Sequence, residues 1–422
     1  MDFLSPLKTA FSILGAYWWI YVPILLVTGT ITGYLVYVTQ KYLLSLKWVL
    51  LEIKPPPDVQ KSPKIAENIF AGLHASYLPV KWKKRFFKGE VPNFYSFEIV
   101  GNGGEISFLI RVTENFRSLV EHVVFAQYPD AEIKEVEDYT KYLPRILPND
   151  DYDLYGTDLV FINDNAYPLR TYPYFEEESG KDEFKRTDPL APLAETLSST
   201  QPGEHVWLQF LIRPTGGKKI IEDAQKIIDK ITGKKVKVEP NALHKTMDFI
   251  EENVFQVPQA EKKDEKQEFN VQKLTPGQRD ILEQVENKIS KLGFKADVRF
   301  LYVARKELFN RARVTSVIGM FKQLYANNMN SFKPNPKTES LAKGILYQVF
   351  PSNKGFFWKW QELRRKIRIY RKYRERTFIK DVVLLNTEEL ATLWHLPGIG
   401  LRAPAFPRVE AKKGQPPAGL PQ

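Results

Sequence analysis

The chain has 422 residues, no cysteine and a formal net charge of +11. Without cysteine it can form neither disulfides nor thiol-based catalytic or metal sites. The length suffices for two or three domains with cores of their own. The excess charge is local, because eleven Lys or Arg stand against two Glu between Lys354 and Lys380.

An uncharged stretch near the N-terminus predicts a single transmembrane helix. From Thr9 to Gln40, 32 consecutive residues carry no formal charge, and about 20 apolar residues suffice to cross a bilayer. We expect a short extracytoplasmic segment at 1–17 and the span at 18–40. The expected interfacial anchors are the flanking aromatic and basic residues Trp18, Trp19, Tyr37, Lys41 and Trp48.

Two alternatives for this stretch are a cleaved signal peptide and a buried core helix. The stretch is longer than the roughly 7–15 apolar residues of a signal peptide, and no small-x-small cleavage site closes it. Lys8 precedes the span, whereas Lys41, Lys47 and Lys54 follow it. The positive-inside rule therefore predicts a single-pass protein of the cytoplasmic (inner) membrane, with its C-terminal body in the cytoplasm.

Residues 45–140 predict an α+β domain with ferredoxin-like element order. A strand at 48–53 is followed by a helix that Ser62-Pro63 opens. Strands at 95–100 and 105–112 flank a Gly-rich hairpin turn, a helix follows Thr113, and a last strand covers 131–136. The order β-α-β-β-α-β is that of a ferredoxin-like sandwich.

Residues 155–350 predict a second ferredoxin-like α+β domain with a helical insertion. The expected strands are 159–162, 205–213 and 296–304, and the expected helices are 219–231, 242–254, 275–292 and 310–325. A charged segment at 259–270 is expected to be mobile. A basic helix at 354–380, a closing strand and helix at 381–400, and a proline-rich, linker-like tail at 401–422 complete the chain.

Residue patterns for catalysis are missing from the sequence. The Gly-Lys pairs at 180, 217 and 233 lack the other residues of a phosphate-binding P-loop. The five histidines are scattered, without metal-ligand spacing, and Asp150, Asp151 and Asp153 are typical of a solvated turn. The sequence therefore predicts a binding protein rather than an enzyme, with no cofactor and no metal.

The basic helix is the strongest candidate for a binding site. We expect Trp360, Leu363, Ile367 and Tyr370 on one apolar face, with cations around them. Three interpretations stay open: contact with anionic lipid, contact with nucleic acid, or a passive exposed helix. The candidate phosphate contacts are Arg364, Arg365, Lys366, Arg368, Arg371, Lys372, Arg374 and Arg376.

Several segments resemble a known family. These are Trp48-Val-Leu-Leu-Glu-Ile-Lys-Pro55, Lys61-Ser-Pro-Lys-Ile-Ala66, Phe70-Ala-Gly-Leu-His74 and, after the basic helix, Leu384-Leu-Asn-Thr-Glu-Glu-Leu-Ala-Thr-Leu-Trp-His-Leu-Pro397. Together they resemble the N-terminal, non-motor region of bacterial conjugative, type IV secretion-like DNA-transfer ATPases of the HerA–FtsK kind. The resemblance follows the order of residues 18 to 422 and is loose in the middle.

The resemblance implies an anchor and α+β modules that position a hexameric DNA translocase at the membrane. In that family a proline-rich linker leads to the ATPase domain, whose catalytic residues have no counterpart in these 422 residues. The implied partners are the lipid bilayer, a P-loop ATPase that is encoded separately or lies in a missing C-terminal part, DNA, and further copies of the chain. The alternative is a membrane scaffold whose basic helix binds lipid.

Overall fold

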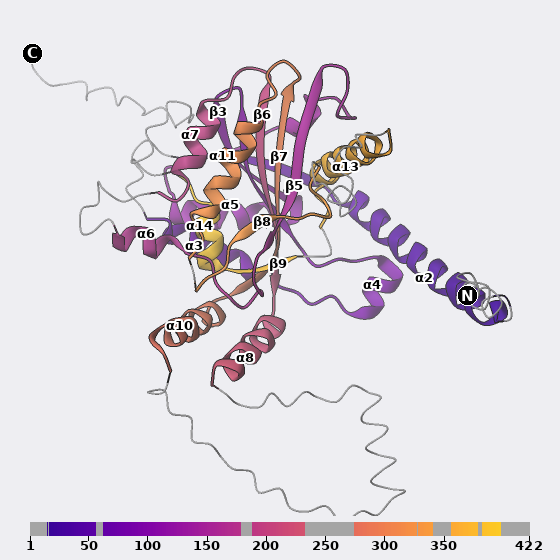
Figure 1. Cartoon of the computed structure of the whole chain (residues 1–422), viewed down its shortest axis with the longest axis horizontal. Helices are drawn as coiled ribbons and strands as arrows, with labels where there is room; N and C mark the ends of the chain where they lie inside the picture. Colours follow the sequence, from indigo (N-terminus) through magenta and orange to yellow (C-terminus); the bar gives the residue numbers. More distant parts are fainter. Residues whose placement is uncertain are drawn as a thin grey trace, which may run out of the picture.

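Nine strands form one antiparallel sheet, from which a long N-terminal helix projects (Figure 1). The computed structural model describes residues 15, 17–55, 62–178, 188–232, 274–326, 328–340, 356–378 and 382–397. The strands are β1 (Trp48–Lys54), β2 (Tyr95–Asn102), β3 (Glu105–Thr113), β4 (Glu132–Glu135), β5 (Tyr152–Phe161), β6 (Glu204–Thr215), β7 (Gly293–Arg305), β8 (Phe332–Pro334) and β9 (Val383–Asn386). The architecture is thus mixed α and β around a large antiparallel sheet.

The helices pack on both faces and at one end of this sheet. They are α2 (Trp18–Ser45), α3 (Lys64–His74), α4 (Trp82–Lys88), α5 (Arg117–Gln127), α6 (Tyr172–Glu178), α7 (Ala191–Ser198), α8 (Lys218–Thr232), α10 (Pro276–Ser290), α11 (Arg311–Lys322), α13 (Phe356–Glu375) and α14 (Thr387–Leu393). Helices α8 and α10 pack against each other through a small apolar cluster that also includes Ala166.

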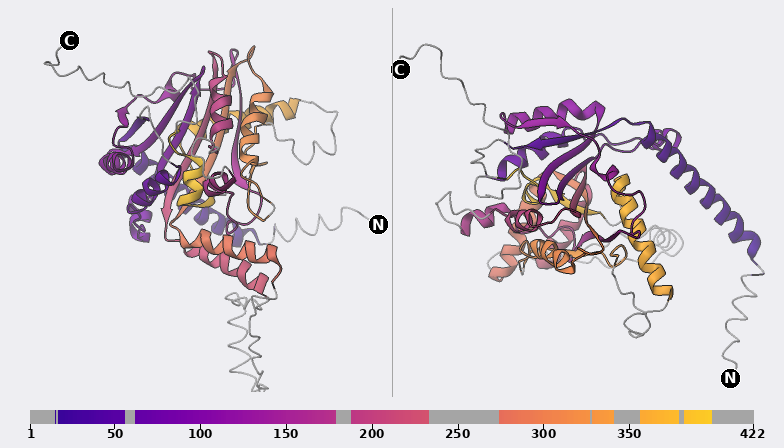
Figure 2. Two further views of the ribbon diagram at one scale, coloured as in Figure 1. Left: turned by 90° about the vertical axis from the view of Figure 1, so that its left-hand side faces the viewer. Right: turned by 90° about the horizontal axis from the view of Figure 1, so that it is seen from above.

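Helix α2 is apolar enough and long enough to cross a membrane over Tyr21–Ser45, and none of that span is buried within the protein. It extends from the sheet as an arm (Figure 2). Trp18, Trp19 and Tyr37 are exposed along it. Lys41 is exposed near its C-terminal end.

Trp48 has a different place from the interfacial one expected. It begins β1, and its ring lies 4.9 Å from that of Phe94, with the Arg111 guanidinium 4.3 Å above it. Its indole N–H donates to the carbonyl of Leu43 at the end of α2. Trp48 therefore belongs to the joint between α2 and the sheet, because the strand begins directly after the helix.

The strand order is repeated in two halves of the chain. Strands β1 to β4 lie in the order β4-β1-β3-β2, and β5 to β8 lie in the matching order β8-β5-β7-β6. The halves are not separated in space, because β2 pairs with β6 along its whole length, from Tyr95 opposite Ile212 to Asn102 opposite His205. The predicted segments 45–140 and 155–350 therefore contribute to one continuous sheet.

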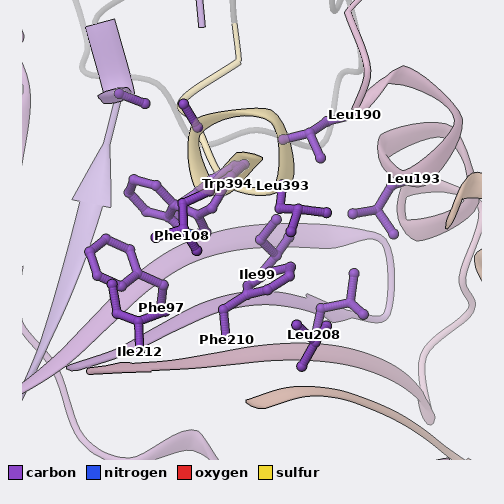
Figure 3. Close-up of a cluster of buried hydrophobic side chains, with 14 of the residues drawn as sticks. Phe97, Ile99, Phe108, Leu190, Leu193, Leu208, Phe210, Ile212, Leu393 and Trp394 are labelled. Atoms are coloured by element: carbon purple, nitrogen blue, oxygen red, sulfur yellow. The ribbon is translucent and has the colours of Figure 1, made fainter. Parts of the chain in front are cut away.

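Successive side chains along the central strands point to opposite faces of the sheet, so the apolar core has two parts. Leu208 and Phe210 of β6 join the larger apolar cluster, whereas Trp207 faces the other side. On the first face, Trp394, directly after α14, packs over Phe97 of β2, and leucines of α7 lie on the side of Ile99 (Figure 3). On the second face, a smaller cluster joins the sheet to α13 and to the segment 139–147.

Some expected elements have other bounds in the structure. Strand β5 begins at Tyr152 rather than at 159, because it pairs with β7 from Tyr152 opposite Arg305 onward. Gly293 does more than end a helix: it opens β7 and lies between Thr215 and Asn386 of the two neighbouring strands. The expected helix 242–254, the segment 259–270, the tail 401–422 and most of 1–17 lie outside the described residues.

Candidate nucleic-acid interface

Helix α13 carries the basic segment of the sequence. Its 20 residues include neither Gly nor Pro, and its last turn holds Lys372 and Arg374, whose charge suits the C-terminal end of a helix dipole. The helix ends at Glu375, and the next residue, Arg376, adopts a left-handed conformation with φ 51°. The basic helix expected at 354–380 is thus present over Phe356–Glu375.

The apolar face of α13 includes Tyr370, as expected, but otherwise differs from the expected one. Ile369, Tyr370 and Tyr373 are buried, whereas Trp360 and Leu363 are 43% and 41% exposed. Helical spacing puts Lys366 on the same face as the buried residues rather than on the face of Trp360. The expected stripe was displaced because two cations, Lys366 and Arg376, are buried together with the aromatic residues.

Helix α13 packs closely on the sheet, because a side chain of the helix lies against the backbone of a glycine in β5. Gly156 of β5 lies under Ile369, and a Cβ atom at Gly156 would come 2.8 Å from the Cγ2 of Ile369. The hydroxyl of Tyr370 donates to the carbonyl of Pro144, 2.9 Å away. The helix therefore contacts both the second half of the sheet and the segment that joins the halves.

Lys366 forms ion pairs with acidic residues of the protein. Its Nζ lies 2.8 Å from Asp153 of β5 and 2.9 Å from Glu362 one turn earlier, and its side chain is 8% exposed. Asp153 therefore lies in a strand and binds a helix, rather than lying in the solvated turn expected. Lys366 is removed from the set of cations that a phosphate outside the protein could reach.

Arg376 is the second buried cation. Its guanidinium binds Glu98 of β2, with Nε 2.8 Å from Oε1, and Asp138, with Nη1 2.6 Å from Oδ2. Burial alone would raise the pKa of Glu98, but the charge of Arg376 lowers it below its ordinary value. Burial likewise opposes the charge of Arg376, whereas Glu98 and Asp138 raise its pKa well above the usual range. Arg376 is thus a structural cation and is unavailable to an outside phosphate.

A polar row continues from Glu98 across four strands. Glu98 lies opposite Gln209, Gln209 opposite Arg299, and Arg299 opposite Asp158 in the sheet register. Side-chain hydrogen bonds join the neighbours: Gln209 Nε2 donates to Glu98 (3.1 Å), and Arg299 donates to Gln209 (2.9 Å) and Asp158 (2.7 Å). The row crosses from the first half of the chain to the second at the β2–β6 pair.

This row holds the C-terminal end of α13 through its backbone. Arg299 donates to the carbonyls of Lys372 and Thr377, and Gln209 donates to that of Tyr373. Burial would lower the pKa of Arg299, but Asp297 and Asp158 raise it above its ordinary value, so the guanidinium stays charged. Buried donors aimed at carbonyls in and just after the last helical turn satisfy groups that would otherwise lack partners.

Six of the eight candidate cations remain at least partly accessible on the outer side of α13. Arg364, Arg368 and Arg371 are exposed, and the remaining three are half-buried. We call the six the basic ridge: Arg364, Arg365, Arg368, Arg371, Lys372 and Arg374. At 1.5 Å per residue, the ridge is about 15 Å long.

Two ridge arginines lie over aromatic rings of their own helix. The guanidinium of Arg364 is 4.4 Å from the ring of Trp360, and that of Arg374 is 5.6 Å from the ring of Tyr370. Such contacts limit the freedom of long side chains. The ridge is therefore a cationic surface on a helix whose rotation is fixed by buried pairs.

The closing motif of the resemblance has structural roles here. Asn386 caps α14 in a reciprocal capping box with Glu389, whose carboxylate also binds the fully buried Lys288 at 3.0 Å. Burial lowers the pKa of Lys288 despite this partner. His395 contacts the carbonyl of Ala391 and the carboxylate of Asp188. The motif therefore joins α14 to α10 and to the sheet.

The histidines and carboxylates of the described residues do not form a metal site. Among the described residues, no group of three His, Asp or Glu could hold a metal ion. His74 contacts the carbonyl of Thr215, and His205 contacts the side chain of Asn102. His244 lies outside the described residues.

Sequence reasoning missed the acidic and polar partners of α13. The available signal was the presence of Glu98, Gln209 and Arg299 inside runs that otherwise read as buried strands. Charged residues are almost never fully buried unless paired, so each implied a partner elsewhere in the chain. Helix α4, a second basic segment, was missed as well, although all eight residues from Lys81 to Lys88 are basic or aromatic.

Comparison with known families gives one match. Residues 42–404 match the family described as Domain of unknown function (DUF8128). The matched range covers the sheet, the basic ridge and α14, and it begins within the last turn of α2. No curated protein matches the chain.

Proposed function

Because the chain belongs to the family described as Domain of unknown function (DUF8128), which names no activity, we infer its role from its own residues and propose a membrane-anchored, non-catalytic module. It holds a DNA-translocating or secretion ATPase at the cytoplasmic membrane. Helix α2 is the single-pass anchor, the sheet is the cytoplasmic body, and the basic ridge contacts the DNA.

The basic ridge is the observation that carries this proposal. Arg364, Arg368 and Arg371 are exposed on one helix, whose orientation is fixed by Lys366 and Arg376 in the interior. Duplex DNA carries one phosphate charge per about 1.7 Å of axis, so a cationic edge of about 15 Å spans several phosphates. A fixed helix loses less side-chain and backbone freedom on binding than a flexible segment.

The repeated strand order supports the two ferredoxin-like modules of the proposal. Each half begins and ends with a β-α-β step and has the order 4-1-3-2 in the sheet, which is the arrangement expected of that fold. In the second half, α8 and α10 are inserted between β6 and β7. The two modules are joined edge to edge through β2 and β6. In this proposal the fused pair presents the ridge on one face, while the ATPase and further copies of the chain contact the remaining surface.

Purification with partners tests the proposal. The full-length protein, extracted in detergent with an affinity tag, should recover a P-loop ATPase identified by mass spectrometry. It should also bind duplex DNA with an affinity that falls steeply with salt. Recovery of no P-loop ATPase, together with DNA binding that is absent at low salt, would contradict the proposal.

A second candidate function is a membrane scaffold whose ridge binds anionic lipid. It is favoured by the position of α13, which extends toward the same side of the protein as α2 in Figure 1 and in the right-hand view of Figure 2. Nanodiscs of phosphatidylcholine, with or without about 30 mol% phosphatidylglycerol, separate the two functions. If the ridge binds lipid, phosphatidylglycerol will occupy it. Substitutions in the ridge will then no longer change the affinity for DNA.

A further inference from the structure

Helix α4 is a short basic and aromatic helix beside the apolar arm. The segment Lys81–Lys88 contains five cations and three aromatic residues: Lys81, Lys83, Lys84, Arg85, Lys88, Trp82, Phe86 and Phe87. None of the helix residues Trp82–Lys88 is buried. Trp82 and Phe87 are 68% and 64% exposed. Large aromatic side chains with such exposure, next to cations, are typical of surfaces that contact membranes.

Two contacts attach α4 to α2. The rings of Tyr34 and Phe86 are 5.4 Å apart. Gly89, which ends α4 with φ 67°, lies so close to α2 that a Cβ atom there would come 2.3 Å from the carbonyl oxygen of Val38. Helix α4 is therefore fixed against the segment 34–38 of α2.

That segment coincides with the expected end of the hydrocarbon core. The apolar span begins at Tyr21, and about 17–20 residues cross the core of a bilayer. Counting from Tyr21, the second boundary falls at about 37–40, next to Lys41, the first charged residue after the span. With α2 as the membrane anchor of the proposed function, on which this inference rests, α4 lies at the depth where headgroups meet acyl chains.

We propose that α4 is an interfacial helix that binds the headgroups of anionic phospholipids beside α2. Trp82 and Phe87 enter the boundary region, where aromatic rings are favoured. The cations contact the negatively charged headgroups. Lys84 also pairs with Glu90 at 3.3 Å, but an exposed pair of this kind is weak and leaves the surface strongly positive. This contact is independent of what the basic ridge binds.

A depth measurement in the intact protein tests the proposal. Because the chain has no cysteine, Phe87→Cys gives a single site for a nitroxide label in the full-length protein. The matched control is Phe125→Cys on α5, which is 40% exposed on the body of the protein. Both variants are placed in nanodiscs of phosphatidylcholine with about 30 mol% phosphatidylglycerol.

We expect the label at position 87 to collide more with oxygen than with a water-soluble nickel chelate, and the label at 125 to show the reverse. Equal preference for the nickel chelate at both positions would overturn the proposal. If duplex DNA protects the label at 87 in pure phosphatidylcholine, and phosphatidylglycerol does not, the surface binds nucleic acid and the proposal is also overturned.

Charge removal tests the lipid class. A variant with Lys81, Lys83 and Lys88 changed to Gln is compared with a control in which the exposed lysines Lys306, Lys322 and Lys333 are changed to Gln. Each cation near an anionic surface strengthens binding about fivefold. The preference of the protein for spin-labelled phosphatidylglycerol over phosphatidylcholine should fall severalfold in the first variant and stay unchanged in the control. An equal preference in both variants would contradict the headgroup contact.

Discussion

Arg376 and Glu98 are 278 positions apart and form an ion pair of 2.8 Å in the interior of the protein. The pair joins the residue after α13 to the second strand of the first half. Asp138, in the segment that joins the two halves, also binds the Arg376 guanidinium. The orientation of the basic ridge therefore depends on buried charges as much as on apolar contacts.

Substitution of Glu98 by Gln should destabilise the protein strongly. The variant leaves Arg376 buried with Asp138 as its remaining acidic partner, and breaking a buried pair costs about 3–5 kcal/mol of unfolding free energy. Urea unfolding followed by circular dichroism measures the loss. Glu105→Gln, at an exposed position of β3, should change the free energy by less than about 0.5 kcal/mol.

A double substitution separates the pair from its surroundings. Glu98→Gln with Arg376→Met removes both charges, and replacing a whole buried pair is often close to neutral. The double variant should lose less stability than the sum of the two single variants. Additive losses would show that the two residues act independently, against the structure.

His205 should make stability depend on mild acid. Burial lowers its pKa to about 4, although Glu204 nearby favours the charged form. The ordinary pKa in an unfolded chain is about 6.5, so the unfolded state binds the proton first as pH falls. The folded state is therefore favoured while His205 is neutral in the unfolded chain as well, above about pH 6.5. As pH falls toward 4, the unfolding free energy decreases by up to about 3 kcal/mol. Urea unfolding at a series of pH values measures it.

The matched variant for this pH effect is His205→Gln. Its amide can still donate to Asn102, which accepts from the His205 ring at 2.8 Å, but it does not titrate. The slope of stability between pH 6.5 and 4.5 should be smaller in the variant. An unchanged slope would assign the pH dependence to other groups.

The closing motif should act on stability alone. Asn386→Ala removes the side-chain cap of α14 and should lower the unfolding free energy by about 1–2 kcal/mol. DNA binding of the folded variant should equal that of the wild type, since α14 lies on the opposite face of the sheet from the ridge. Weaker DNA binding at unchanged stability would contradict a purely structural role.

Gly89→Ala should separate α4 from α2. The new Cβ meets the backbone of Val38 and the position has a left-handed conformation, so both the clash and the strain oppose the native contact. In a Tyr34→Cys, Phe86→Cys background, a short bifunctional thiol reagent should link α2 to α4, and Gly89→Ala should lower the yield. The control Gly29→Ala, where an added Cβ would meet nothing within 4 Å outside the backbone of its own helix, should leave the yield unchanged.

Much of the fold follows from local patterns in the sequence. The uncharged N-terminal run predicts a helix apolar enough to span a membrane, which α2 confirms. Alternation and the Gly-rich turn predict β2 and β3, and both are present with small changes of bounds. These signals are short-range, so a single sequence contains them.

The rest depends on contacts between distant segments. The pairing of β2 with β6 joins the two halves, and nothing in either strand alone selects the other as its partner. The buried face of α13 was assigned correctly at Tyr370 but wrongly at Trp360 and Leu363. Lys366 and Arg376 are charged, and their partners on other elements (Asp153, Glu98 and Asp138) lie more than 200 positions away. Periodicity ranks apolar residues as buried and cannot recognise a cation whose charge is satisfied inside the protein.

The salt dependence of DNA binding tests the role of the basic ridge most directly. A variant with Arg364, Arg368 and Arg371 changed to Gln is compared with the control variant at Lys306, Lys322 and Lys333, in phosphatidylcholine nanodiscs. If the three arginines contact phosphates, the plot of log affinity against log salt should become less steep by about 3 in the ridge variant. The control should keep the wild-type slope. Equal slopes for the wild type and the ridge variant would contradict DNA binding by α13.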